Sequence, residues 1–386
     1  MNVSVLSARH IPYAPVRSEN VIRMTMLFQN TSIPHSVQRA YDLTILHATA
    51  VSGGFSGATV MRATTTDGRE LAIRRTPKSV SLPQERIRRL HGLLSHVSRS
   101  GYQLIPVPLM PVKTETQFHQ GVHRPAVPWL QEEDCLWQIE PWMPGSSLAG
   151  HELTTPHLKS ALIALNRFHQ LATEAVCVVG SDDWFLNATR PSPAILRRLN
   201  LVDELQAGLL KKLEHRSCVD SDERFRCLAI PVCEALTTWL PWLQRELTAL
   251  AMIAFPIQPV LRDIWRAHVI FTDCDVTGLI DLTAAASDHV TVDLARLFRS
   301  WFGNDISRVQ NAVEEYQSLR ILSDSERRLL QTLDACTVLL SPVTWLRRRV
   351  ESGDTASCPG EVIARLTELT DVVRSFRPLI LDTQTQ

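Results

Sequence analysis

The sequence lacks an uninterrupted run of about 18 apolar residues, the length that a membrane-spanning helix requires. It also lacks the pattern of a secretory signal, because Arg9, Arg17, Glu19 and Arg23 are spread among the apolar positions of the first thirty residues. An excess of one charge is missing as well, since 40 basic residues balance 40 acidic ones. We therefore expect no membrane partner and no nucleic-acid partner.

Paired cysteines are also missing. The eight cysteines are scattered, with no CxxC pair and no Cys/His cluster at zinc spacing, so we expect free thiols in a reducing, cytoplasmic compartment. The chain has 386 residues, of which 45% are hydrophobic and 21% charged, as in an ordinary globular protein long enough for two packed lobes.

Local patterns change along the chain. Residues 1–35 show no sustained period, so we expect an N-terminal tail, consistent with disorder, in which Met24 or Met26 is an alternative start. Glycines and β-branched residues between Val51 and Pro77 predict strands joined at an Asp-Gly turn. The apolar spacing from Pro83 to Ser98 predicts an amphipathic helix.

Helical periodicity dominates after Gly145. Thr155 is a candidate cap for the first long helix, and Pro342 is expected to kink or end a later one. These patterns predict an α+β fold with two lobes and a ligand cleft between them. Residues 36–145 are expected to form a small antiparallel β lobe with one helix, and residues 146–386 a larger, mostly α-helical lobe.

One loop and hairpin could carry chemistry. Val269–Phe271 and Val276–Ile280 are predicted strands around a polar turn, and their antiparallel pairing puts His268 roughly opposite Asp281. With Asp263 in the preceding loop, such a unit brings together an isolated carboxylate and two potential metal ligands, which phosphoryl transfer requires. An ordinary surface hairpin with incidental acids is the alternative, because acidic residues are common in this segment: Asp273, Asp275 and Asp288.

A glycine loop precedes the predicted strands. Its backbone N–H groups could approach phosphates, and a plain hairpin turn is the alternative. The residues assigned to nucleotide binding here are Gly53, Gly54, Ser56 and Gly57.

The strand after this loop places a cation toward the cleft. Alternation puts Ala72 and Arg74 on one face. Glu85, on the following helix, is the best-placed acid to pair with Arg74, and a solvated first-turn acid is the alternative for it. Glu140 and Trp142 flank the end of a later strand at Pro141 and are assigned to the nucleotide side, although a strand ending at prolines needs no ligand.

Together these segments resemble the aminoglycoside phosphotransferase and choline-kinase family over residues 37–302. The stretch from Leu261 to His268 resembles the family's catalytic loop, HGDxxxxN, and Asp281 matches its metal-binding aspartate. Leu71-Ala-Ile-Arg74 stands in place of the V-A-I-K strand of kinase-like folds. The segment 137–145 resembles the interlobe linker where backbone groups meet adenine.

The resemblance implies a protein kinase-like fold and a phosphotransferase that moves the γ-phosphate of ATP or GTP to a hydroxyl of a small molecule. Asp263 would be the catalytic-loop base, Asp281 the principal Mg²⁺ or Mn²⁺ ligand and His268 a second ligand. Asp293 matches a structural aspartate of the family, and His169 is expected to be a hydrogen-bonded core histidine.

The chain departs from the family pattern at three places. Leu261-Arg262 replaces His-Gly, Arg74 replaces the lysine, and His268 replaces the asparagine. Arginine differs from lysine in shape and hydrogen bonding, and histidine is a poor ligand for Mg²⁺. Two functions therefore stay open: an active small-molecule kinase, and a catalytically impaired kinase-like binding protein.

Overall fold

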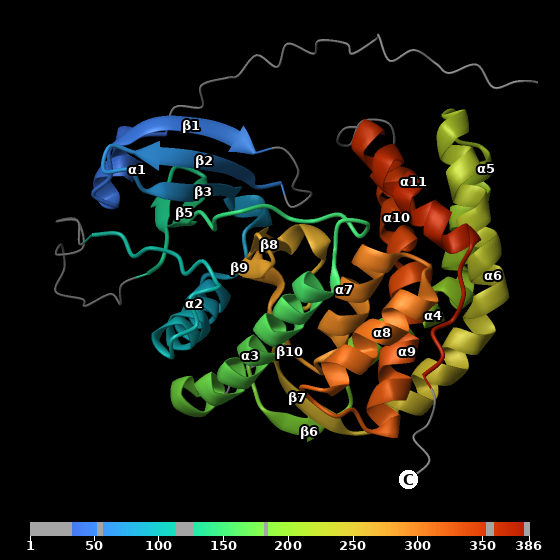
Figure 1. Ribbon diagram of the computed structural model, residues 1–386. Helices are drawn as coiled ribbons and strands as arrows, with labels where there is room; N and C mark the ends of the chain where they lie inside the picture. The colour runs from blue at the N-terminus through green and yellow to red at the C-terminus, as the bar shows by residue number, and fades with distance from the viewer. Residues whose placement is uncertain (1–32, 52–56, 113–126, 181–183, 353–358, 382–386) are drawn as a thin grey trace, which may run out of the picture.

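The computed structural model describes residues 33–51, 57–112, 127–180, 184–352 and 359–381. The chain forms a sheet-containing N-terminal lobe and a mostly helical C-terminal lobe, as the sequence predicts (Figure 1). Residues 1–32, which include most of the expected tail, lie outside the described residues.

The N-lobe is built on a five-stranded antiparallel sheet in the order β1-β2-β3-β5-β4. An Asp67-Gly68 turn joins β2 to β3, because Gly68 adopts the positive φ of 83° that such a turn favours. The lobe consists of α1 (His35–Ala40), β1 (Ile45–Val51), β2 (Thr59–Thr65), β3 (Glu70–Pro77), α2 (Gln84–Arg99), β4 (Leu130–Glu132) and β5 (Cys135–Pro141).

The structure adds two details to the predicted N-lobe. The lobe has a second, short helix, α1, in addition to the predicted α2. Ile33 and Val37 are buried in the same apolar cluster as Met61 and Ile73 of the sheet. Because these side chains are part of the core, the lobe begins before the expected boundary at residue 36.

The C-lobe contains nine α-helices among the described residues, with short strands at its interface to the N-lobe and beneath α3. Its elements are α3 (Thr155–Val179), β6 (Ala188–Arg190), α4 (Pro193–Glu204), α5 (Leu210–Cys218), α6 (Glu223–Ala251), β7 (Phe255–Val260), β8 (Val269–Thr272), β9 (Asp275–Leu279), β10 (Ala286–Asp288), α7 (Thr291–Phe302), α8 (Ile306–Gln317), α9 (Asp324–Leu339), α10 (Ser341–Ser352) and α11 (Pro359–Arg374).

Helix α3 shows how the local sequence sets a helix start. Thr154, not the predicted Thr155, is the N-cap, in a capping box with His157. Pro156 lies in the first turn, where its missing N–H costs no hydrogen bond. The prediction was one residue late because Thr154 and Thr155 are equally good caps by type.

Helices α9 and α10 form an apolar stretch, Asp324–Glu351, that is long enough to cross a membrane by length and composition. In this protein 78% of its most apolar window is buried against other elements, so core packing accounts for the apolar residues. The helical stretch is interrupted at Leu340, between α9 and α10 and just before Pro342, as predicted.

Helix α2 connects the two lobes. Its buried face, including Leu90, Leu94 and Val97, belongs to the C-lobe core cluster and contacts α3. Arg86, from the same helix, donates hydrogen bonds to the carbonyl oxygens of Thr283 and Ala285 at 3.2 and 3.1 Å. The N-lobe helix is therefore fixed to the segment that follows Asp281.

Candidate active site

A cavity of about 410 Å³ lies between the lobes and is called here the interlobe cavity. Its walls come from the N-lobe sheet, the linker after β5 and the β8–β9 hairpin. It collects six of the residues that the sequence assigns to a nucleotide and metal site: Ala72, Arg74, Glu140, Trp142, His268 and Asp281.

The hairpin brings His268 and Asp281 together, as predicted. Val269 pairs with Leu279, and Ile280 donates its N–H to the His268 carbonyl oxygen at 3.0 Å. One residue further, Asp281 Oδ2 lies 3.8 Å from His268 Nε2. Asp281 has a left-handed φ of 56°, which aspartate tolerates better than most residues, and this turns its carboxylate toward the cavity.

Arg74 reaches the cavity from β3 and contacts Asp281. Its Nη2 lies 3.1 Å from Asp281 Oδ1, which also accepts a hydrogen bond from Thr283 at 3.2 Å. The predicted pairing of Arg74 with Glu85 is wrong, because Glu85 forms ion pairs with Arg88 and Arg89 on its own helix. Spacings of three and four residues on a helix favour those local partners.

His268 does not have a nitrogen available for a metal in this arrangement, which corrects its predicted role as a ligand. Its Nδ1 donates to the carbonyl oxygen of Asp263 at 2.8 Å, and its Nε2 accepts from the indole N–H of Trp265 at 2.8 Å. Burial lowers the pKa of His268 below its ordinary value, although Asp281 and Asp263 oppose the change. A neutral ring fits these two bonds and fastens the catalytic loop.

Asp263 lies in this loop with its side chain 42% exposed and forms an ion pair with Arg296 of α7. The preceding residue, Arg262, has a left-handed φ of 65° at the position where the resembling family has glycine. A non-glycine residue in this region is strained by roughly 1–2 kcal/mol. The structure holds it there because Arg262 N–H donates to Asp293 Oδ1 at 2.6 Å.

Asp293 anchors the catalytic loop from inside the C-lobe. It is fully buried, and its Oδ2 accepts hydrogen bonds from the Leu261 N–H at 2.9 Å and from His169 Nε2 at 2.8 Å. The expectation that His169 is a hydrogen-bonded core histidine is confirmed. No pattern in the sequence indicates that His169 and Asp293, 124 residues apart, would meet.

Glu140 lies on β5 opposite Ala72 of β3. Burial, together with the nearby charge of Asp281, raises its pKa to about 7, and the positive charge of Arg74 opposes the change. Its carboxyl group therefore titrates near neutral pH, which sequence reasoning did not indicate.

Trp142 begins the linker between the lobes, and its ring contacts the Arg62 guanidinium at 4.9 Å. The backbone N–H of Trp142 donates to the Glu70 carbonyl oxygen at 3.0 Å. The predicted phosphate loop is placed only in part. Gly53, Gly54 and Ser56 lie outside the described residues, whereas Gly57 has a φ of 74° that suits glycine.

Among the described residues no group of three or more histidine, cysteine or acidic side chains forms a metal cage. Mg²⁺ bound with nucleotide usually takes one or two protein carboxylates, phosphate oxygens and water. Asp281 fits this mode as a single ligand if the Arg74 guanidinium moves away from Asp281 Oδ1 or shares that oxygen with the metal. His268 does not fit this mode, because both of its ring nitrogens already form hydrogen bonds.

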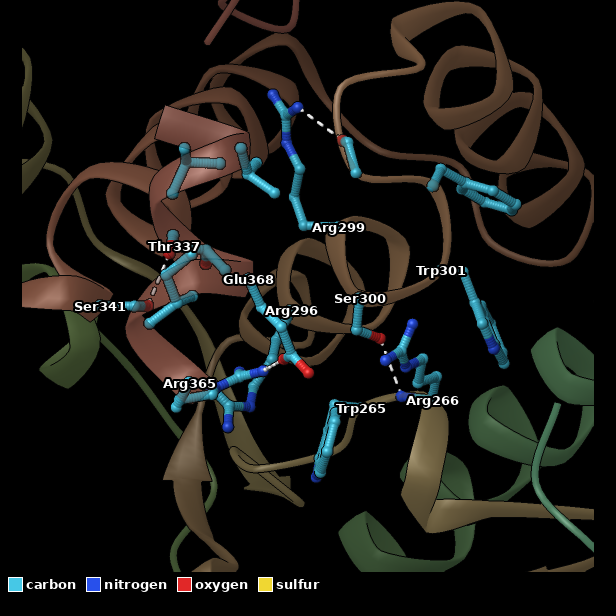
Figure 2. A pocket seen from close by; sticks show the side chains of 15 residues that line it. Trp265, Arg266, Arg296, Arg299, Ser300, Trp301, Thr337, Ser341, Arg365 and Glu368 are labelled. Atoms are coloured by element: carbon cyan, nitrogen blue, oxygen red, sulfur yellow. Dashed lines mark hydrogen bonds and ion pairs between the residues drawn. The ribbon is translucent and has the colours of Figure 1, made fainter. Parts of the chain in front are cut away.

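A second cavity, of about 390 Å³, opens within the C-lobe and is called the C-lobe cavity. Figure 2 shows the side chains that line it, with Trp265 and Arg266 from the catalytic loop, Arg296 from α7 and Arg365 from α11. Trp265 lines both cavities. The loop that carries Asp263 therefore borders both.

A family model described as the phosphotransferase enzyme family (APH) matches residues 47–330. The chain belongs to this family. A homoserine kinase from Gluconacetobacter diazotrophicus is 31% identical over 109 residues, which are 25% of this chain and 34% of the relative. The chain thus matches about a third of that kinase's length.

Solved structures of phosphotransferases share the fold. An aminoglycoside phosphotransferase from Alicyclobacillus acidocaldarius has a TM-score of 0.57 and 15% identity, with 90% of this chain and 95% of that chain covered. A spectinomycin phosphotransferase with ADP and spectinomycin has a TM-score of 0.59 and 12% identity, covering 88% and 96%. An amicoumacin kinase with AMP-PNP and Ca²⁺ has a TM-score of 0.56 and 11% identity, with 91% of this chain and 94% of that chain covered. The predicted kinase-like α+β fold is confirmed.

Proposed function

We propose that this family member is an active small-molecule kinase that moves the γ-phosphate of ATP or GTP to a hydroxyl group. The observation that carries the proposal is the convergence of Arg74 and Asp281 in the interlobe cavity, beside the loop that carries Asp263. The kinases solved with ADP or AMP-PNP that share the fold support a nucleotide co-substrate.

The nucleotide would lie against Ala72 and the linker, with its phosphates toward Arg74. In the transfer, the bond between the γ-phosphorus and the bridging oxygen breaks, and the acceptor oxygen forms the new bond to phosphorus. Asp263 orients the acceptor hydroxyl and receives its proton, while ADP or GDP leaves. Arg74 neutralises phosphate charge, which is most effective in a cavity shielded from water.

Asp281 would hold a divalent cation on the phosphates. Such a cation, when bound, offsets the negative charge of the β- and γ-phosphates. The contact between Arg74 and Asp281 must then rearrange, since both groups turn toward the phosphates. His268 acts as a positioning residue, because it connects the Asp263 backbone to Trp265.

The second candidate function is a kinase-like binding protein with impaired catalysis. It is favoured by three contacts that occupy the catalytic groups: Arg74 on Asp281, Arg296 on Asp263 and Trp265 on His268. Under this alternative the cavity binds a nucleotide or another ligand without transfer.

Thermal unfolding with ATP or GTP, with and without Mg²⁺ or Mn²⁺, tests the nucleotide site. Nucleotide at about 100 times its Kd should stabilise the native chain by roughly 2.7 kcal/mol. We expect a metal-dependent stabilisation that Asp281→Asn abolishes and the matched variant Asp273→Asn, at the exposed hairpin turn, retains. No stabilisation by any nucleotide would contradict the proposed function.

A further inference from the structure

The C-lobe cavity lies beside the predicted catalytic base. Arg296 lines this cavity and also forms the ion pair with Asp263. Its volume of about 390 Å³ falls within the range of roughly 300–1,000 Å³ that small-molecule sites show. A hydroxyl compound seated here would therefore lie next to the Arg296 side chain that pairs with Asp263.

The charged side chains in the wall of this cavity are mainly basic: Arg266, Arg296, Arg299, Arg365 and Glu368. Three of the arginines have acidic partners, namely Arg299 with Asp334, Arg296 with Asp263 and Arg365 with Glu368. Among the described residues no carboxylate pairs with the half-buried Arg266, whose backbone N–H donates to the Ser300 hydroxyl at 2.8 Å. The cavity thus keeps one uncompensated positive charge.

The wall also contains buried hydrogen-bond donors. Arg296 Nε and the indole nitrogen of Trp301 are buried and have no acceptor in the part of the chain that the structure describes. The hydroxyl of Ser300 already donates to the Leu297 carbonyl oxygen, and that of Ser341 to the Thr337 carbonyl oxygen. Buried donors without acceptors are unfavourable.

The surroundings of the catalytic loop add to the positive potential. Arg262 is half-buried, and burial lowers the pKa of its guanidinium, as do the nearby charges of Arg197, Arg86 and Arg198. Asp288 opposes this change and pairs with Arg197.

We propose that the acceptor of this protein carries an anionic group, a carboxylate or a phosphate, in addition to its hydroxyl, and that Arg266 binds that group in the C-lobe cavity. The anionic group would accept hydrogen bonds from the guanidinium fork of Arg266. The proposal rests on the proposed function for the role of the bound anion as acceptor, but binding of the anion is independent of it. Polyamines and quaternary ammonium compounds are excluded as preferred acceptors.

A series of three-carbon compounds isolates the charge. Glycerol, D-glycerate, glycerol 3-phosphate and 3-amino-1,2-propanediol share one skeleton and differ in one group. Their affinities for the full chain are measured by calorimetry at constant ionic strength, with the nucleotide site occupied by AMP-PNP and again without nucleotide. We expect D-glycerate or glycerol 3-phosphate to bind at least tenfold more tightly than glycerol and the amine, and the comparison between them separates carboxylate from phosphate.

Arg266→Gln tests the named contact. Loss of one charge-assisted hydrogen bond should weaken the binding of the anionic compound roughly 10- to 100-fold. Arg365→Gln, from the opposite wall, should weaken it less because Glu368 already pairs with Arg365. Arg245→Gln removes an arginine that is 69% exposed on α6, and serves as the matched control with unchanged binding.

Equal or tighter binding of the amine would overturn the proposal, and so would unchanged anion binding in Arg266→Gln or the absence of binding by both anions. Failure of AMP-PNP to bind would contradict the proposed nucleotide site instead. In that case, the anion affinities measured without nucleotide still test the C-lobe cavity. The two proposals therefore fail separately.

Discussion

Arg74 is the residue whose identity separates this chain most clearly from the usual kinase-like strand. Its ion pair with Asp281 stands where a lysine would pair with an acid of the following helix, and Glu85 does not reach it. In the proposed kinase the guanidinium fork would keep a positive charge at the phosphates, but it also binds Asp281, the proposed metal ligand. Its contribution to nucleotide binding is the net of these two effects.

Substitution at Arg74 measures that net effect. We expect Arg74→Lys to preserve or raise the affinity for Mg·ATP, because a lysine keeps the charge and holds Asp281 less firmly. Arg74→Ala should weaken it roughly tenfold or more through loss of a charged contact. Arg75→Ala, on the opposite face of β3, is the matched control. Equal Kd values for wild type and both Arg74 variants by calorimetry would remove Arg74 from the site.

Glu140 predicts a pH dependence. Its pKa rises from 4.5 to about 7 on folding, so the folded state holds the proton more tightly than the unfolded state. Stability should therefore fall as pH rises from about 4.5 through about 7, because ionised Glu140 is unfavourable in the cavity. We expect Glu140→Gln to stabilise the chain by on the order of 1–3 kcal/mol near pH 8 and to have little effect near pH 4.5. Urea unfolding at the two pH values measures this, and an equal effect at both would be inconsistent with the raised pKa.

At the scale of elements, a few long-range contacts hold the catalytic segments. α7 contributes Asp293 to the backbone of the catalytic loop, α3 contributes His169 to Asp293, and α2 contributes Arg86 to the carbonyl groups after Asp281. The periodicity of the sequence predicted α2 and α3, whereas Asp293 of α7 was assigned by the family resemblance. The sequence could not predict the contacts, because periodicity identifies the buried face of a helix but not the partner across the core.

Asp293 tests this anchoring. Asp293→Asn places an amide N–H against at least one of the three donors that now meet the carboxylate, which should destabilise the fold by about 1–3 kcal/mol. In the proposed kinase, the rate of ADP formation from ATP should fall in parallel, because the loop that carries Asp263 loses its fixed backbone. Asp371→Asn, an exposed residue of α11, should change stability by less than about 0.5 kcal/mol. Similar melting curves for both variants would mean that the loop does not depend on Asp293.

At the scale of the whole molecule, the α+β division and the positions of Arg74, Asp263 and Asp281 could be predicted from the sequence. Strand alternation and a short hairpin fix such positions within a few residues. Three features could not be predicted, because each depends on residues distant in the sequence. They are the hydrogen bonds at both nitrogens of His268, the left-handed conformation of Arg262 and the basic C-lobe cavity. The two cavities share Trp265, so the loop that carries Asp263 borders both of them.

The rate of ADP formation from Mg·ATP, with and without a bound anionic hydroxyl compound, tests the central claim most directly. We predict turnover by the native chain, a loss of roughly 10²- to 10⁴-fold in Asp263→Asn with nucleotide binding retained, and no comparable loss in Asp273→Asn. Nucleotide binding without turnover in the native chain, or equal turnover in Asp263→Asn, would contradict the account, and the first of these results would favour the kinase-like binding protein.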